Sequence, residues 1–368
     1  MSSKDIVRVG VIGSGAGEFH LKGYGEDDRA EVVAIAGLDT DRVVKLANQY
    51  GVKDTHREYQ EMLARDDIDA VSVAVPNFLH MPVALAAFEA GKHVLVEKPL
   101  ARNAAEGVAM VEAARAHNKV LGVSFQRRTR HDVQLLKHAI DNNEFGNIYY
   151  AKAWWMRRSG IPGLGSWFTS KEAAGGGPLI DLGVHVLDML MYVMGNPEVH
   201  SVTGTTYAQI GPTGRGGWPG RGRFEVTAEQ PYEVEDLASA FIRLKNGGTV
   251  LLEASWASFT EMVDDFGIQV YGPEGGARIF AKQYALTDSL EIYKNFGDTT
   301  QDSKPRTFAR EGHGQVIHSF IDAILNGAPM QPSGLEGLAN IQLIDAIYKS
   351  AALGREVILD EEIAQISE

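Results

Sequence analysis

The sequence of 368 residues contains no cysteine. Its absence excludes disulfides, thiolate metal sites and a cysteine nucleophile together. It is compatible with a reducing compartment, where disulfides are rare. The sequence also has no internal repeat and no low-complexity tail, so we expect folded domains throughout.

Long apolar runs and an excess of basic residues are missing as well. The opening segment, MSSKDIVRVGVIG, has no apolar core of the length that a signal peptide needs, and the run 6–12 is too short to span a bilayer. Lys and Arg number 35 against 48 Asp and Glu, for a formal net charge of −13. Such a surface repels polyanions. We therefore expect a cytoplasmic protein without nucleic-acid or membrane partners.

The composition that remains is that of an ordinary globular protein, with 44% hydrophobic and 23% charged residues. A chain of this length should form about two domains, because single cores stop growing near 250 to 300 residues. Through about residue 125, short β-branched runs alternate with amphipathic stretches, which is typical of a parallel sheet with crossover helices. Later runs are joined by turns such as 245–248, which favours an antiparallel sheet. We predict a doubly wound α/β domain over 1–125 and an α+β domain over 126–368.

The hydrophobic pattern also predicts individual elements. In the first domain we expect strands at 6–12, 32–38, 70–75, 93–96 and 120–124 and helices at 41–50, 82–90 and 104–117. In the second we expect strands at 148–156, 199–210, 234–244, 249–258, 268–271 and 290–293 and helices at 132–142, 315–326 and 335–352. The stretch 211–222 is too glycine-rich for regular structure, and we expect a long mobile excursion between two strands there. It could be a plain surface loop, or a lid or subunit contact.

A glycine-rich turn follows the first predicted strand. Gly13, Gly15, Ala16 and Gly17 lie in GSGAG, although the usual fingerprint is displaced because Glu18 stands where its third glycine is expected. Glycines at such a turn let the backbone approach a pyrophosphate, whose charge the amides of the next helix stabilise. The turn therefore predicts a dinucleotide site, with a plain strand-to-helix turn as the alternative.

Further residues at strand ends complete the predicted cofactor site. Asp39 ends the second strand, where a carboxylate accepts hydrogen bonds from a ribose 2′-hydroxyl and repels a 2′-phosphate. We therefore expect NAD rather than NADP, a preference that the nearby Arg42 weakens. The carboxyl edge of an open parallel sheet is where nucleotides bind. The remaining residues predicted there are Pro76, Asn77, His80, Glu97 and Lys98.

Three residues have the chemistry of an acid/base set. Asp181 and His185 are four apart after a triple glycine, so on a helix the carboxylate could hold the imidazole in one tautomer. Lys98 follows an apolar run, where partial desolvation would help its ammonium to polarise an oxygen. A helical Asp/His pair can also be a purely structural hydrogen bond. Ligands at metal spacing do not accompany the pair, so we expect no metal.

Taken together, GSGAG, VPNFLH, EKPL, FQRR and GGGPLIDLGVHVLD resemble the family of glucose–fructose oxidoreductase, inositol dehydrogenase and the rhizopine-catabolism proteins, over essentially the whole chain. The resemblance implies a Rossmann domain followed by an open, mostly antiparallel sheet, with the active site between them. It implies that Lys98, Asp181 and His185 line the substrate pocket and that Lys98-Pro99 is cis. It also implies a homodimer or homotetramer formed through the open sheet face.

Two more residues are singled out by the resemblance. Arg127 lies where relatives have residues that face nicotinamide and substrate, with a surface salt bridge as the alternative. Trp167 lies in GSWFT, where many relatives read Trp-Arg and this chain has Phe168, which puts that cofactor contact in doubt. The surrounding segment WWMRRSGIPGLGSWFT is aromatic and basic. It could line a carbohydrate pocket, or its alternate residues could serve core and interface.

The function that we predict is oxidation of a secondary hydroxyl of a sugar, inositol or related glycoside, or the reverse ketone reduction. The hydride would pass to nicotinamide C4, His185 would take the hydroxyl proton, Lys98 would polarise the oxygen, and Asp181 would orient His185. One rival is a redox-neutral enzyme that cleaves or epimerises a glycoside with retained NAD. The other is a non-catalytic dinucleotide sensor, although such relatives would be expected to lose the lysine or histidine.

Overall fold

The structure is a computed structural model that describes residues 6–220, 222–310 and 312–359. It has two compact units. Unit 1 comprises Met1–Gln126 with Gly312–Ile341, and unit 2 comprises Arg127–Glu311 with Gln342–Glu368. The division proposed from the sequence places all of residues 126–368 in the second domain, whereas the compact units place 312–341 with the first.

Unit 1 contains a six-stranded sheet with the order β3-β2-β1-β4-β5-β6, in which all neighbours are parallel. This is the doubly wound order of a Rossmann fold, as predicted. The strands are β1 (Val7–Ile12), β2 (Ala30–Ala36), β3 (Asp54–His56), β4 (Ala70–Val73), β5 (His93–Glu97) and β6 (Leu121–Ser124). Apart from the short and mostly exposed edge strand β3, these strands are rich in buried β-branched and aliphatic residues, which suits strands that are covered on both faces.

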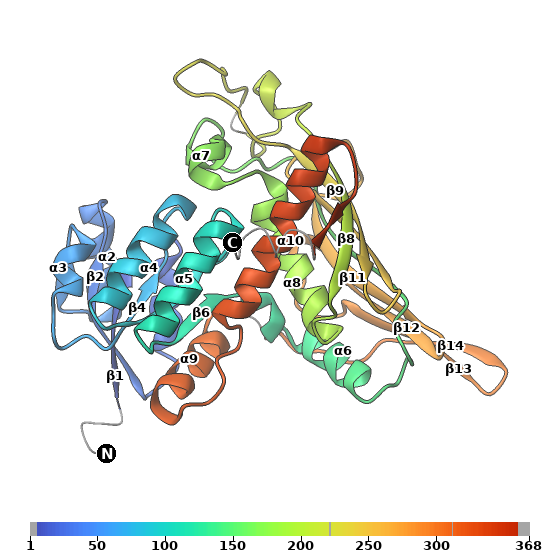
Figure 1. Cartoon of the computed structure of the whole chain (residues 1–368), viewed down its shortest axis with the longest axis horizontal. Coiled ribbons are helices and arrows are strands. Elements are labelled where there is room, and N and C mark those ends of the chain that lie inside the picture. The colour runs from blue at the N-terminus through green and yellow to red at the C-terminus, as the bar shows by residue number, and fades with distance from the viewer. Residues whose placement is uncertain (1–5, 221, 311, 360–368) are drawn as a thin grey trace. The chain divides into compact units, whose positions relative to one another are not determined.

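The helices of unit 1 follow the strands in alternation (Figure 1). They are α1 (Gly17–Tyr24), α2 (Thr40–Tyr50), α3 (Tyr59–Leu63), α4 (His80–Glu89), α5 (Ala104–Ala116) and, from late in the chain, α9 (Gly314–Asn326). The apolar face of α9 joins the core around β1, since Val316, Ile317 and Phe320 are buried in one cluster with Val9 and Leu21. This burial explains why residues from late in the chain belong to unit 1.

Unit 2 contains a nine-stranded sheet with the order β14-β13-β12-β11-β7-β10-β9-β8-β15. The β7–β10 pair is parallel and the other neighbours are antiparallel, so the mostly antiparallel sheet is confirmed. The strands are β7 (Tyr150–Arg157), β8 (Val199–Tyr207), β9 (Leu237–Leu244), β10 (Thr249–Ser255), β11 (Asp264–Gly272), β12 (Gly275–Ala281), β13 (Leu290–Phe296), β14 (Thr299–Ser303) and β15 (Val357–Ile358). The β9–β10 hairpin turns at residues 245–248, as expected.

Helices α6 (His131–Asp141) and α8 (Val184–Val193) pack on this sheet, and α7 (Lys171–Ala174) is a single turn. Helix α10 (Gly334–Leu353) has its first part in unit 1 and its second part in unit 2. Most predicted elements are found with ends shifted by one to three residues. The predictions missed β3, α3, α7, β12, β14 and β15, and they gave no bounds for α1 and α8. The polar sequences DTH of β3 and TTQDS of β14 explain two of these omissions, because neither shows an apolar alternation.

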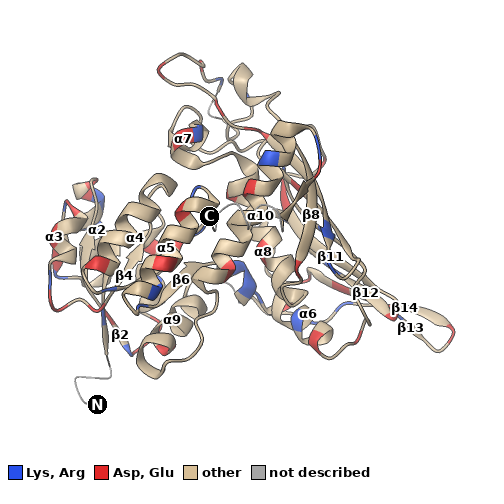
Figure 2. Ribbon diagram, viewed as in Figure 1, with Lys and Arg blue, Asp and Glu red and all other residues tan. Residues whose placement is uncertain are grey.

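Among the described residues, one largely helical stretch, Lys171–Val193, is long and apolar enough to cross a membrane, but 83% of its most apolar window is buried inside the protein, as in a core helix. Charges of both signs are interspersed along the helices in Figure 2. Many form local pairs, such as Arg65 with Asp54 and Asp67. Exposed pairs of this kind add little stability.

Candidate active site

The glycine turn of unit 1 has the geometry that a tight phosphate-binding turn requires. Gly13 has a φ of +107°, and a Cβ built there would lie 2.1 Å from the carbonyl oxygen of Ala74. At Gly15 nothing lies within 4 Å of a built Cβ, so this position faces open space. Gly17 begins α1, and its Cβ would lie 3.0 Å from Val11. The turn therefore combines close packing at both ends with an open middle at the start of a helix, which fits a dinucleotide phosphate.

Asp39 follows β2 close to this turn. A Cβ at Gly37 would lie 3.7 Å from the backbone nitrogen of Ser14, so the end of β2 adjoins the glycine turn. Asp39 is the N-cap of α2, and its Oδ1 accepts a hydrogen bond from the backbone N–H of Arg42 at 3.1 Å. The side chain is exposed. The carboxylate thus has a structural role that the sequence argument did not include.

The residues predicted at the ends of β4 and β5 are held by buried histidines. His80 is fully buried, with Nδ1 2.8 Å from the carbonyl oxygen of Pro99 and Nε2 2.9 Å from that of Val75. These contacts link the two strand-end loops, and a neutral imidazole, which has a single N–H group, donates to one of the two carbonyl oxygens. Burial lowers the pKa of His80. Asn77, next to Pro76, is also buried. His80 thus has a structural role in this fold.

Glu97 ends β5 and accepts hydrogen bonds from His20 and His313. The backbone N–H of Lys98 donates to its other carboxylate oxygen at 3.1 Å, and the Lys98-Pro99 bond is cis. Burial alone would raise the pKa of Glu97, but the hydrogen bonds from the two histidines hold it well below its usual range. Glu97 is therefore a buried anion directly before Lys98.

In unit 2, Asp181 lies on a π-helical turn (Leu179–Gly183) that leads straight into α8, where His185 is buried. The triple glycine before this turn has a steric cause. A Cβ at Gly176 would lie 2.0 Å from the hydroxyl of Tyr348, and one at Gly177 would lie 2.2 Å from the carbonyl oxygen of Glu235. Neither position has room for a side chain.

The buried carboxylate of Glu235 then fixes the start of the turn. It accepts the backbone N–H groups of Gly177 and Leu179 at 3.0 Å each, and the Tyr348 hydroxyl at 2.8 Å. Burial raises the pKa of Glu235, and these hydrogen bonds lower it in part. Because Leu179 is two residues from Asp181, these bonds position the candidate catalytic pair.

A cluster of aromatic and charged side chains surrounds the pair. The indole N–H of Trp256 donates to Asp181 at 2.9 Å, and the ring of Trp155 lies 5.6 Å from that of His185. The indole N–H of Trp155 donates to Asp264 at 2.7 Å, and Asp264 pairs with Arg157 at 2.9 Å. Burial alone would lower the pKa of Arg157, but Tyr284, Asp181 and Asp264 raise it. Polar groups and ring faces thus meet at one place.

Tyr284 also belongs to this cluster, because Arg157 donates a hydrogen bond to its hydroxyl at 2.8 Å. Burial raises the pKa of Tyr284, and Arg157 lowers it in part. Gln283 and Tyr284 both have positive φ angles, of 48° and 63°, which is uncommon for residues other than glycine. Backbone strain of this kind is concentrated at functional sites.

The structure separates the two alternatives left open for Arg127. Its guanidinium is buried and lies about 5 Å from the rings of Trp155, Phe266 and Tyr284. A surface salt bridge is therefore ruled out. Trp167 is half-buried and stacks on Phe168 at 3.9 Å. The aromatic strand β7 alternates as expected, with Trp155 and Arg157 on the buried face and Trp154 on the other.

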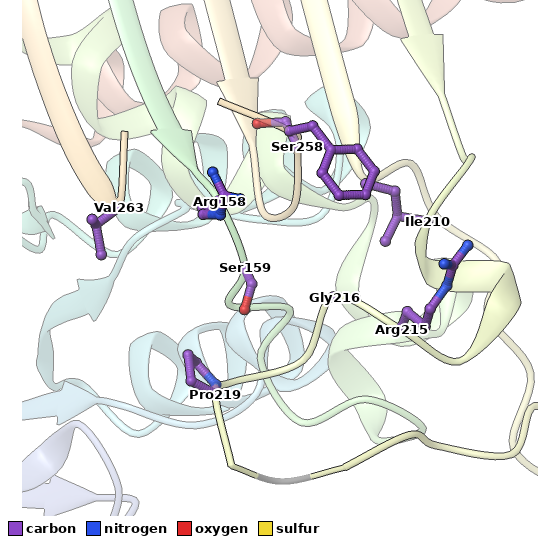
Figure 3. Close-up of a pocket in the computed structure, with 9 residues that line it drawn as sticks. Arg158, Ser159, Ile210, Arg215, Gly216, Pro219, Ser258 and Val263 are labelled. Atoms are coloured by element: carbon purple, nitrogen blue, oxygen red, sulfur yellow. The ribbon is translucent and has the colours of Figure 1, made fainter. Parts of the chain in front are cut away.

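The glycine-rich loop approaches this cluster. Gly216 accepts backbone hydrogen bonds from Gly160 and Ile161, and Trp218 lies over Arg157 at 5.0 Å. Beside the loop is a cavity of about 440 Å³, shown in Figure 3. Its lining residues are Arg158, Ser159, Ile210, Arg215, Gly216, Pro219, Ser258, Phe259 and Val263. The loop is therefore anchored to β7, and residue 221 of the predicted excursion lies outside the described residues.

Each predicted site residue thus has a defined place. Asp181, His185 and Arg127 lie in one cluster of unit 2, and the glycine turn and Asp39 adjoin each other in unit 1. Lys98 lies in unit 1. Sequence reasoning missed Arg157, although it noted its segment, and gave no signal for Trp256, Asp264, Tyr284 or Glu235. The order WWMRR on a strand could have marked Arg157, because Trp155 and Arg157 alternate onto one face.

Comparison with known families gives matches over both units. Residues 7–125 match the family described as "Oxidoreductase family, NAD-binding Rossmann fold", and residues 133–278 match the "GFO/IDH/MocA C-terminal domain". D-glucoside 3-dehydrogenase of Escherichia coli is 33% identical over 96% of this chain and 97% of its own length. Myo-inositol 2-dehydrogenase of Thermotoga maritima is 28% identical over 97% of this chain and 100% of its own.

Solved structures agree. Levoglucosan dehydrogenase in complex with NADH and levoglucosan superimposes with a TM-score of 0.83 at 26% identity, and covers 96% of this chain and 99% of its own. GenD2 from gentamicin A biosynthesis, in complex with NAD, gives a TM-score of 0.77 at 27% identity with 96% of each chain covered.

Proposed function

This chain belongs to the GFO/IDH/MocA family of oxidoreductases and has an NAD-binding Rossmann domain, and on that premise we propose that it is an NAD-dependent dehydrogenase of a carbohydrate secondary hydroxyl. The observation that carries the proposal is the half-buried Asp181 and the buried His185, which tryptophan and arginine side chains surround. Such a wall offers ring faces for a sugar and fixed donors for its hydroxyls.

The residues of unit 1 fit NAD. The open space at Gly15 accommodates a phosphate next to the backbone, and the amides at the start of α1 stabilise its charge. The exposed Asp39 carboxylate would accept a hydrogen bond from the 2′-hydroxyl of the adenosine ribose and would repel a 2′-phosphate. We therefore propose NAD rather than NADP. When bound, NAD supplies the acceptor for the hydride.

The roles of the chain's own groups follow from acid/base chemistry. His185 accepts the proton of the substrate hydroxyl as the carbinol becomes a ketone, and Asp181 stabilises the imidazolium. Trp256 fixes the Asp181 carboxylate through its indole N–H. The Lys98 ammonium donates a hydrogen bond to the same substrate oxygen and stabilises developing negative charge. In the reverse direction the same groups return the proton to a ketone.

The substrate class that we propose is a pyranoside or a cyclic polyol. Two of the relatives that align over nearly the whole chain are D-glucoside 3-dehydrogenase and myo-inositol 2-dehydrogenase, and a structural relative holds levoglucosan. A ring that bears several hydroxyls matches a site with Arg157, Asp264 and Tyr284 as polar partners. We rank glucosides first because that relative has the highest identity of the three.

The test is absorbance of reduced nicotinamide with purified protein, NAD and a panel of methyl glucosides, inositols, aldoses and sugar acids. A substrate-dependent rise is expected with at least one glucoside or inositol. His185→Ala should lower kcat by about 10²-fold or more with NAD affinity unchanged. His138→Ala, a change at an exposed position on α6, is the matched control and should behave as the wild type. A near-normal kcat in His185→Ala would refute the assigned role.

The same assay separates the redox-neutral rival. That rival requires that NADH does not accumulate while mass spectrometry shows cleaved or epimerised sugar, because the hydride returns to the product in each cycle. Net NADH formation in proportion to ketone would exclude it. The acid/base groups serve either chemistry, so only the fate of the reduced cofactor distinguishes them.

We also propose that the protein works in the cytoplasm as a homodimer or homotetramer joined through the open sheet face of unit 2. On that face Trp154 lies 5.9 Å from Phe280, and Tyr150 lies 5.2 Å from Tyr271, all half-buried. A partly exposed cluster of aromatic side chains on a sheet face is typical of an interaction surface. Light scattering after size exclusion should give a mass of two or four chains, and Trp154→Glu should shift it toward one. A monomeric wild type would refute this proposal.

A further inference from the structure

A buried hydrogen-bond network lies behind the end of β5, away from any role assigned so far. Glu97 accepts the Nε2–H groups of His20 at 2.9 Å and His313 at 2.7 Å, both on Oε1. Its Oε2 accepts the backbone N–H of Lys98 at 3.1 Å. All three side chains are at least 91% buried, and they come from α1, β5 and the start of α9.

The network continues to the hydroxyl groups of Ser72 and Tyr24, which are consistent with a neutral His20. Ser72 lies 2.9 Å from Nδ1 of His20, and the Tyr24 hydroxyl lies 2.8 Å from Ser72. If Tyr24 donates to Ser72 and Ser72 donates to Nδ1, then His20 carries its proton on Nε2 and donates it to Glu97. Burial lowers the pKa of His20, which favours this neutral form. Glu97 then has hydrogen-bond donors on both carboxylate oxygens.

We propose that His20, Glu97 and His313 are positioning residues that fix the backbone of Lys98, and thereby the place of its ammonium, in the dehydrogenase reaction. This inference rests on the proposed role of Lys98. On the other side of Lys98, the Pro99 carbonyl oxygen is held by His80 at 2.8 Å. The lysine backbone is therefore fixed on both sides by buried side chains.

The same three residues could instead be read as metal ligands, because their ligand atoms lie within 4.8 Å of one another. The contacts favour the hydrogen-bonded arrangement. Both imidazole nitrogens approach one carboxylate oxygen at 2.7 and 2.9 Å, which is normal for N–H···O bonds. A zinc ion at about 2.0 to 2.2 Å from each ligand atom would hold these atoms further apart.

A matched pair of variants at His313 tests the proposal. His313→Gln keeps an N–H donor near the position of Nε2, whereas His313→Leu removes it. We expect His313→Leu to lower kcat with NAD and the substrate from the panel by about 10-fold to 10²-fold, since small misplacements of catalytic groups have effects of that size. We expect His313→Gln to recover most of that loss, and Kd for NAD to change by less than about threefold in both.

A second variant removes the charge. In Glu97→Gln the amide must present its NH₂ group either to the two histidines or to the Lys98 N–H, so a donor faces a donor. The kcat should fall at least as far as in His313→Leu. Val52→Ala is the stability control, because Val52 is buried beside β3, at the far edge of the sheet from β5. It should lower the Tm without lowering kcat.

Lys98→Met separates this inference from the proposed function. If Lys98→Met keeps wild-type kcat, the role of Lys98 itself is wrong. If Lys98→Met is inactive while Glu97→Gln and His313→Leu keep wild-type kcat, the positioning role is refuted and the function stands. Equal losses of kcat in His313→Gln and His313→Leu would also overturn the positioning role. Stoichiometric zinc in the purified protein, detected by mass spectrometry, would do the same.

Discussion

The glycine turn allows a prediction in which stability and cofactor binding respond to different residues. Gly13→Ala places a Cβ 2.1 Å from the Ala74 carbonyl oxygen, against a practical minimum of 3.0 Å, so backbone atoms must separate by 3.0 − 2.1 = 0.9 Å. The residue also has a φ of +107°, where a side chain costs about 1 to 3 kcal/mol. With the added overpacking we expect a loss of about 3 kcal/mol or more.

Gly15→Ala is the matched substitution in the same turn. A Cβ there meets nothing within 4 Å, so the free energy of unfolding should change by less than about 1 kcal/mol. The same Cβ would occupy the space through which the backbone approaches the pyrophosphate. NAD affinity should therefore fall by about 10-fold or more in this variant.

Thermal unfolding and NAD titration by intrinsic fluorescence measure the two effects in one set of samples. Gly13→Ala should lower the Tm by roughly 6 °C or more, taking about 2 °C per kcal/mol for a chain of this size. Gly15→Ala should keep the wild-type Tm and lose the NAD-induced rise in Tm. A Gly15→Ala protein that binds NAD as tightly as the wild type would refute the assignment of this turn to the cofactor.

Three other predictions follow from single contacts. Asp39→Ser keeps an N-cap for α2 and removes the charge. It should reduce the preference for NAD over NADP by about 10-fold with little change in Tm. An unchanged preference for NAD would remove Asp39 from the cofactor site. Gly177→Ala puts a Cβ 2.2 Å from a backbone oxygen, so it should lower both kcat and Tm. Gly195→Ala is the control: its Cβ would have no neighbour within 4 Å, but the residue has a positive φ, so only the Tm should fall. Burial lowers the pKa of His93 to about 4, from 6.5, and its Nδ1 accepts a backbone N–H, so its contribution to stability is complete above about pH 6.5 and is lost as the pH falls toward 4. Because Asn does not titrate, the free energy of unfolding of His93→Asn should fall by about 1 kcal/mol less than that of the wild type between about pH 7 and pH 5, after allowance for partial exposure. Urea unfolding at each pH measures this free energy, and the same pH dependence in variant and wild type would contradict the assignment.

The sequence predicts the fold well where periodicity and sterics act locally. The strands of unit 1 other than β3 are apolar runs, and the turn at residues 245–248 predicts the β9–β10 hairpin. Prediction fails for β3 and β14, whose residues are polar and exposed, because their only support is pairing with a neighbouring strand. Hydrogen bonds between distant segments leave no local signal.

The candidate site likewise combines residues that local patterns predict with residues that they do not. Its reactive groups lie in short motifs that can be read locally, but the groups that hold them come from elsewhere in the chain. Trp256 bonds Asp181 across 75 residues, and His313 bonds Glu97 across 216. Glu97 itself shows the limit of a motif, since its place before Lys98 suggested contact with the cofactor. The structure gives its carboxylate three donors from the protein, which the motif did not indicate.

The triple glycine shows why motif and cause must be separated. Read as sequence, the glycines mark the start of a helix that carries an Asp/His pair. In the structure Gly176 and Gly177 are required because Tyr348 and Glu235 occupy the space of their side chains. Glu235 can bond the amides of Gly177 and Leu179 only because that space is empty. The glycines therefore affect the reaction through Glu235. Removing the Glu235 carboxylate and adding a side chain at residue 177 should both lower kcat by disrupting the same hydrogen bonds. The double variant should then lower kcat little more than either single variant.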